Sequence, residues 1–216
     1  MNTMTLPVPV RALLFASMGA AATALALRLW AAAATAEEPV LWWASRATGF
    51  VAYGALALSV LFGVLISSKG SGGLVSRKAV MDLHQQWTLS AVVATVLHIV
   101  TTVFHAEAGV TPWATVIPFA SRTLTGPVAI GTVAFIGMAV IAATSWWRKR
   151  VPYAAWRAIH ALAFGVMVLA LAHSVTAGTD TALPAVRWMY IGTAAVLLGA
   201  IVTRVLVALG DRRARA

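Results

Sequence analysis

The apolar residues of this chain fall into runs of about twenty, the length that an α-helix needs to cross the core of a bilayer. Helices are expected because a backbone in contact with lipid must satisfy its hydrogen bonds within the segment. The predicted spans cover residues 12–34, 41–67, 80–104, 128–145, 155–175 and 185–209. We therefore expect an all-α membrane protein, a bundle of six transmembrane helices that forms a single domain over residues 1–216.

Composition excludes several classes of protein. The chain is 61% hydrophobic and only 10% charged, which is too apolar for a soluble domain. It has no cysteine, and this excludes disulfides, iron–sulfur clusters, thiolate-ligated haem and covalently attached c-type haem. The net charge is +10, but the basic residues lie in short loops beside the spans, where membrane topology places them. We therefore expect no nucleic-acid partner.

The basic residues also predict an orientation. If the N-terminus is inside, twelve of the sixteen Lys and Arg residues lie on the inner side and four on the outer side. This asymmetry predicts a multi-pass protein of the plasma membrane with both termini in the cytoplasm. Residues 12–34 also resemble a signal peptide, although Arg28 favours a retained first span. The longest segment between spans, residues 106–127, is expected to form a short interfacial helix or a cap.

Four histidines lie at two matched depths in this apolar background. The third span carries His84 and His98, fourteen positions apart, and the fifth carries His160 and His173, thirteen apart. Both spans run from inside to outside, so each depth receives one histidine from each span. At about 1.5 Å per residue the two levels are about 20 Å apart. Two b-type haems fit at these levels in a core about 30 Å thick, and bis-imidazole haem suits electron transfer.

Helical periodicity agrees with this interpretation in one span and not in the other. At about 100° per residue, an offset of fourteen returns nearly to the same face of a helix. The offset of thirteen between His160 and His173 leaves the two side chains well over about 100° apart on an ideal helix. We therefore expect either a tilt or distortion of the fifth span, around Gly165, or haems on different sides of it.

Histidines in a membrane span can also serve other roles. A single histidine in a span is often a hydrogen-bonding core residue, and a proton relay would need buried acids, whereas Asp82 is the only acid near a span. A zinc site needs ligands clustered within a few ångströms, which two depths forbid. His105 lies beyond the matched set and is expected to meet a propionate, a substrate or solvent.

Arginines at the outer level are candidate partners for haem propionates. Arg matches a carboxylate with two parallel hydrogen bonds. The alternative is that these side chains only extend to the membrane interface. The candidates are Arg46, Arg122 and Arg187, with Arg28 as a further outer arginine.

The spacing of the histidines and several phrases of the sequence resemble the ferric reductase-like transmembrane domain. The phrases are SRATGFVAYGALALSVLFG at 45–63, VIPFASR at 116–122, YAAWRAIHALAF at 153–164 and LAHSVTAGTD at 171–180. This family is shared by ferric reductases and NADPH oxidases, and the chain is similar to its short bacterial members. The resemblance implies that His84 and His160 hold the iron of an inner haem b, and that His98 and His173 hold that of an outer one.

The resemblance also implies a function. Electrons would pass from a separate cytoplasmic flavoprotein reductase or a membrane quinol to an extracytoplasmic acceptor such as ferric iron, oxygen or a periplasmic reductase. The last case resembles the haem subunit of the methionine sulfoxide reductase system. No GxGxxG occurs in the 216 residues, so we expect no FAD or NAD(P)H site in this chain. The alternatives are a cytochrome b subunit of a larger redox complex without its own substrate, and a proton-coupled transporter that uses the histidines directly.

Overall fold

The computed structural model describes residues 40–67 and 76–213. Within these ranges the chain is helical and has no strand, as expected for an all-α protein. The α-helices are α2 (Val40–Ser67), α3 (Arg77–Phe104), α4 (Thr125–Trp146), α5 (Tyr153–Ala161), α6 (Ala163–Ala177) and α7 (Pro184–Arg213). Short 3-10 helices join them: η1 (Ala106–Ala108), η2 (Pro112–Thr115), η3 (Arg148–Arg150) and η4 (Thr179–Ala182).

Five of the predicted spans are confirmed as helices that are long and apolar enough to cross a membrane. They are Val40–Ser67, Arg77–Phe104, Thr125–Trp146, Tyr153–Ala177 and Pro184–Thr203, where the fourth comprises α5 and α6. Their ends lie within a few residues of the predicted ones. The predicted first span, residues 12–34, and Arg28 lie outside the described residues.

The outward surface of α3 is apolar in a way that suits a lipid environment. Leu89, Val93, Leu97 and Phe104 recur every four or seven residues along one stripe, and each is about half exposed or more, from 48% for Leu97 to 72% for Phe104. A stripe of this kind would be costly in water but not against lipid tails. The opposite side of the helix holds the buried Ala91 together with the two histidines.

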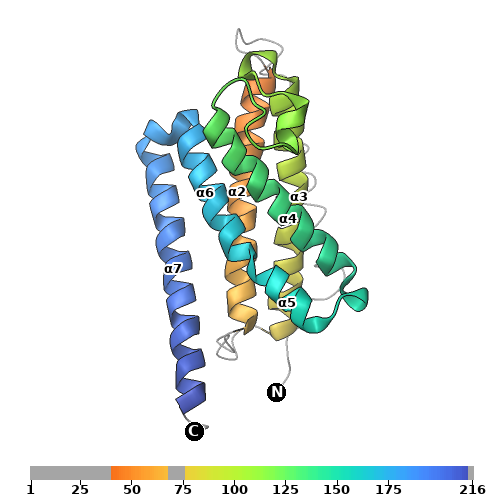
Figure 1. Ribbon diagram of the computed structural model, residues 1–216. Helices are drawn as coiled ribbons and strands as arrows, with labels where there is room; N and C mark the ends of the chain where they lie inside the picture. The colour runs from red at the N-terminus through yellow and green to blue at the C-terminus, as the bar shows by residue number, and fades with distance from the viewer. Residues whose placement is uncertain (1–39, 68–75, 214–216) are drawn as a thin grey trace, which may run out of the picture.

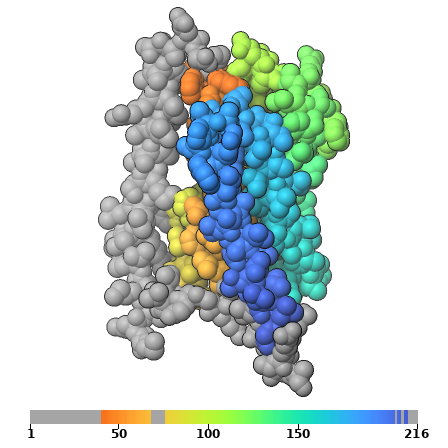
Figure 2. Space-filling view, turned by 90° about the vertical axis from the view of Figure 1, so that its left-hand side faces the viewer, coloured from red at the N-terminus to blue at the C-terminus, as the bar shows by residue number. Residues whose placement is uncertain are grey.

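The helices pack as two closely associated pairs, α2 with α3 and α4 with α6 (Figure 1). The third span, α3, and the span formed by α5 and α6 carry the histidines, and they make little backbone contact with each other. Helix α7 packs on α2, where Tyr190 meets Tyr53 edge to face at 5.2 Å, and it runs along the side of the bundle (Figure 2). The two histidine-bearing spans therefore face each other across a space that backbone does not fill.

A break at Leu162 divides the fourth described span into α5 and α6. The amide of Leu162 donates to the carbonyl of Ile159, three residues back, at 3.0 Å, and the next helix starts at Ala163. The expected distortion of this span is confirmed, but it occurs three residues before Gly165. The break changes the angular relation of the two halves, so that His160 and His173 both face α3 despite their offset of thirteen.

The segment between α3 and α4 folds over one end of the bundle, which confirms the expected cap. Gly109 adopts a left-handed conformation with φ of 65°, and its carbonyl accepts the amide of Arg122 at 3.2 Å. A Cβ at Gly109 would lie 2.6 Å from Thr123, so only glycine fits this turn. Thr132 on α4 ties the cap to the bundle by donating to the carbonyl of Ala114 at 2.5 Å. We call this end, where η4 also lies, the Asp180 end, and the opposite one the Arg148 end.

Candidate cofactor site

Two pairs of imidazole rings face each other between α3 and the α5–α6 span. The ring centroids of His84 and His160 lie 6.0 Å apart, and those of His98 and His173 lie 6.2 Å apart. The ring planes in each pair are inclined at 73°. The structure thus brings the histidines together in the expected pairs, while their role as ligands of haem iron stays a prediction.

Helix α2 supplies the hydrogen-bond acceptors for both histidines of α3. The Nδ1 of His98 lies 2.7 Å from the carbonyl oxygen of Ser45, and that of His84 lies 2.8 Å from the carbonyl oxygen of Ser59. A main-chain carbonyl only accepts, so Nδ1 carries the proton in both rings and Nε2 keeps a free lone pair. This is the tautomer that a metal-binding imidazole needs.

A glycine four residues further along α2 leaves each of these carbonyls accessible to the ring. In an α-helix the carbonyl of residue i points toward residue i+4, and the residues four positions after Ser45 and Ser59 are Gly49 and Gly63. A Cβ built on Gly49 would lie 3.1 Å from the Nδ1 of His98, and one on Gly63 would lie 3.4 Å from the Cε1 of His84. The missing side chains let the imidazoles approach the backbone of α2.

Helix α4 provides the same arrangement for His173. The Nδ1 of His173 lies 2.9 Å from the carbonyl oxygen of Pro127, and the residue four positions later is Gly131. A Cβ on Gly131 would lie 2.7 Å from that Nδ1 and 2.8 Å from Cε1, which is closer than real contacts allow. Three of the four paired histidines therefore share one arrangement, a main-chain acceptor at position i and a glycine at i+4.

His160 differs from the other three. Its Nδ1 has the hydroxyl of Ser145 at 3.5 Å as its neighbour, where the others have a main-chain carbonyl. The indole of Trp156 stacks on its ring, with centroids 4.9 Å apart and planes inclined at 23°. The same hydroxyl accepts the indole N–H of Trp156 at 3.3 Å, so Ser145 serves both rings.

A cavity of about 310 Å³ opens at the level of His98 and His173. Both histidines line it, together with Gly49, Gly131 and the charged pair of Arg46 and Asp180. Its volume lies at the lower end of the range of about 300–1,000 Å³ for ligand and cofactor sites. Its lining is mostly apolar, as in sites that hold a planar hydrophobic cofactor.

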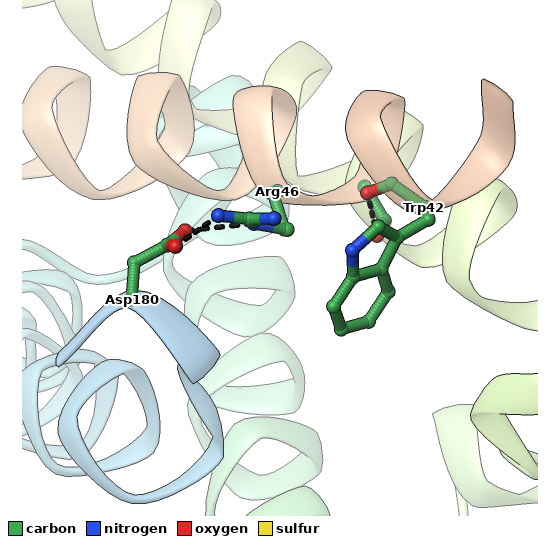
Figure 3. A network of polar contacts seen from close by, with 4 residues as sticks. Trp42, Arg46 and Asp180 are labelled. Carbon is green, nitrogen blue, oxygen red and sulfur yellow. Dashed lines mark hydrogen bonds and ion pairs between the residues drawn. The ribbon is translucent and has the colours of Figure 1, made fainter. Parts of the chain in front are cut away.

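Arg46 makes an ion pair at the edge of this cavity. Its guanidinium donates to both carboxylate oxygens of Asp180, one of them at 2.7 Å, and the side chains are 25% and 13% exposed. The guanidinium also lies over the rings of Trp42 and Trp43, 5.5 and 4.8 Å from their centroids. Figure 3 shows it between Asp180 and Trp42. Of the predicted propionate partners among the described residues, Arg46 is the one that lines the cavity.

The remaining sequence-derived candidates lie apart from the pairs. Arg122 and Arg187 have exposed side chains and do not line the cavity. His105 is buried, its Nδ1 accepts the amide of Ala108 at 3.2 Å, and its ring meets Trp42 edge to face. His105 therefore caps η1 in this structure. It does not face either histidine pair.

Sequence reasoning missed the residues that orient the rings. The sequence does not show which main-chain carbonyls accept a hydrogen bond, because every residue has one. It does show the glycines. Ser45 and Gly49 recur as Ser59 and Gly63, fourteen residues later, and fourteen is also the spacing of the histidines on α3. A search for equal spacings on neighbouring spans would have found this match.

The site offers paired ligands rather than a metal cage. Among residues 40–67 and 76–213 no group of three or more His, Cys, Asp or Glu side chains gathers closely enough to hold a bare metal ion. Each pair instead presents two imidazoles from opposite sides. Such a pair suits a metal whose remaining coordination positions come from a planar cofactor.

Comparison with known proteins gives one match. Residues 40–180, which contain both histidine pairs, match a sequence family described as a domain of unknown function, DUF8596. No curated protein and no solved structure matches the chain.

Proposed function

We propose that this chain, which belongs to the DUF8596 family, binds two haems of the b type and transfers electrons across a membrane. The observation that carries the proposal is the pair of facing imidazoles at each of two levels. The histidine spacing and several phrases of the sequence resemble the ferric reductase-like transmembrane domain. This resemblance supports the same conclusion.

The distance between the rings fits an iron atom between them. Metal–imidazole bonds are about 2.0–2.1 Å long, so two of them, plus the ring radii, place the centroids of opposed imidazoles roughly 6 Å apart. The observed distances of 6.0 and 6.2 Å agree with this value. By this proposal His84 and His160 hold one haem, and His98 and His173 hold the other.

The surrounding residues fit the same role. A metal-binding histidine almost always donates its other ring N–H to a carbonyl, a carboxylate or water, which fixes the tautomer and makes the ligand more basic. His84, His98 and His173 all have such a carbonyl within 2.9 Å. A histidine used only as a hydrogen-bonding core residue would not need a second imidazole ring facing it at 6.0 or 6.2 Å.

The ligand set favours electron transfer over chemistry at the iron. When bound, each haem supplies a centre that takes up and gives up one electron. Because two imidazoles would hold each iron, neither site would offer an open coordination position to a substrate. The chain's own residues hold the two centres about 20 Å apart along α3, on the basis of fourteen residues at about 1.5 Å each.

Charge favours the Arg148 end as the cytoplasmic one. Arg148, Lys149 and Arg150 lie there, as does Arg77 at the start of α3. Short loops rich in Lys and Arg remain on the cytoplasmic side of a membrane. By this proposal electrons enter at the His84–His160 level and leave at the His98–His173 level, where Arg46 lines the cavity and is the candidate for holding a propionate.

The donor and acceptor are proposed by class. A separate flavoprotein reductase or a membrane quinol would reduce the chain, and the basic Arg148 end would attract an acidic protein. The acceptor outside the cytoplasm would be ferric iron, oxygen or a periplasmic reductase, and the membrane would be the bacterial plasma membrane.

Proteoliposomes test the transfer of electrons. Purified protein is reconstituted in vesicles that contain ferricyanide, and dithionite is added outside. We expect the trapped ferricyanide to be reduced faster than in protein-free vesicles, and we expect His98→Ala to remove most of the difference because it interrupts the path at one level. Equal rates in vesicles with and without the protein would contradict the proposal.

The inclination of the ring planes predicts a spectroscopic signature. Nearly perpendicular imidazoles would leave the dxz and dyz orbitals of a low-spin ferric haem, which hold its unpaired electron, almost degenerate. The EPR signal would then be strongly anisotropic with a large g maximum. Since both pairs are inclined at 73°, both haems should give this signal. A rhombic spectrum, typical of parallel rings, would show that the bound rings are oriented differently.

A further inference from the structure

The two histidine pairs differ in how they connect to the protein surface. Trp156 stacks on His160 at 4.9 Å, and Tyr153 stacks on Trp156 with centroids 5.9 Å apart and planes inclined at 29°. Tyr153 is 61% exposed. An unbroken series of aromatic rings therefore leads from the surface of the Arg148 end to a paired imidazole. Within residues 40–67 and 76–213, no other paired histidine has an aromatic ring stacked on it.

Several contacts hold the series in place. The indole N–H of Trp156 donates to Ser145 at 3.3 Å. The guanidinium of Arg148 lies over Trp156 at 4.6 Å and over Tyr153 at 6.0 Å. A cation placed over an aromatic face is attracted to it. The ring of Trp156 is thus held by a hydrogen bond at its N–H and by a cation over its ring, which a side chain that merely marked the membrane interface would not require.

The surface around Tyr153 is strongly basic. Four basic residues are exposed there: Arg148, Lys149 and Arg150 on η3, and Arg157 on α5 (Figure 1). Such a field attracts an anionic donor and raises its rate of encounter. The aromatic rings and the positive charge therefore coincide at one place on the molecule.

We infer that Tyr153 and Trp156 form the electron-entry contact of the His84–His160 site. The inference rests on the proposed function and adds the place and the kind of donor. The donor is a reduced flavin carried on an acidic protein surface. One electron leaves the flavin and reduces ferric to ferrous iron at the His84–His160 site. The two aromatic rings couple the donor to the site, and they are neither oxidised nor protonated in the overall step.

Stopped-flow reduction of the haem-loaded protein in nanodiscs, with photoreduced FMN as the donor, tests this inference. We expect Trp156→Leu to slow haem reduction severalfold, and Trp156→Phe to keep most of the rate because an aromatic ring remains over His160. The matched control is Trp146→Leu, which removes a tryptophan that is 87% exposed at the same end of the bundle and should reduce at the wild-type rate.

Haem content and midpoint potentials of the same variants distinguish two roles for Trp156, electron entry and positioning of the His160 ring. We expect Trp156→Leu to keep both haems and near wild-type potentials. Loss of a haem, or a shift in potential large enough to explain the slower rate, would make Trp156 a support for its ligand and overturn the inference. Reduction of Trp156→Leu at the wild-type rate would also overturn it while leaving the proposed function intact. A wild-type protein that binds no haem would overturn both the inference and the proposed function.

Discussion

Replacing His173 with alanine should remove one of two bound haems and leave the other. The substitution deletes one ligand of the His98–His173 pair, and the His84–His160 pair is about 20 Å away along α3 by helical rise. We expect the haem-to-protein ratio to fall to about half, because two separate bis-imidazole sites lose their haems independently. Pyridine haemochromogen assays of the purified variants measure this ratio directly.

The other histidine substitutions sharpen the test. His98→Ala should remove the same haem as His173→Ala, so the double variant should resemble either single one, while His84→Ala or His160→Ala should remove the other haem. His105→Ala is the control, since His105 caps η1 and faces neither pair. If His98→Ala and His173→Ala together remove both haems, or if His105→Ala removes one, the assignment of the pairs is wrong.

A methyl group added at Gly131 should weaken the same proposed site without replacing either of its histidines. The new Cβ would lie 2.7 Å from the Nδ1 of His173, and a rigid imidazole ring can only move away. The ring then loses its hydrogen bond to Pro127, and disturbing such an outer partner typically costs about 10- to 100-fold in metal affinity. Haem titration of the haem-free Gly131→Ala protein measures the loss.

The chain offers controls for this effect on the same helices. Gly126 lies on α4 and Gly54 on α2, and a Cβ on either meets nothing within 4 Å, so alanine there should leave haem binding unchanged. At the ring-facing positions the loss should follow the available space, greatest for Gly131→Ala, smaller for Gly49→Ala at 3.1 Å and least for Gly63→Ala at 3.4 Å. Equal losses at Gly131 and Gly126 would mean that helix flexibility, and not contact with the ring, is the cause.

The spans were predictable because the bilayer imposes a length and a composition on each of them. Five of the six predicted ranges correspond to helices in the described part of the chain. The equal depth of His84 with His160 and of His98 with His173 was also expected, because it follows from helical rise in two parallel spans. That the paired rings face each other required the break in the second of these spans. The spans and the depths depend on counting along the chain, which a single sequence permits.

The break at Leu162 shows where counting fails. No proline marks it, and the expected position, Gly165, was chosen because glycine loosens a helix. A Cβ on Gly165 would meet nothing within 4 Å, so this glycine is not required by a close contact. The interruption is recognised by one hydrogen bond, from the amide of Leu162 to the carbonyl of Ile159. Residues of many types can make a main-chain bond of this kind, so the sequence does not mark it.

Contacts between distant segments were the other limit. Arg46 and Asp180 are 134 positions apart, and nothing in the sequence indicates that they pair. The acceptors of His84, His98 and His173 are main-chain oxygens, which every residue carries. Only the repeated spacing of serine and glycine on α2, read against the spacing of the histidines on α3, offered a signal.

The central claim is that two facing histidine pairs hold two b-type haems, and the haem content of the wild-type chain tests it most directly. The protein is purified from cells supplied with haem, and its pyridine haemochromogen spectrum is measured against its concentration from amino-acid analysis. We predict two haems b per chain and a sharp α band on reduction. A chain that folds but shows no Soret band would contradict the claim.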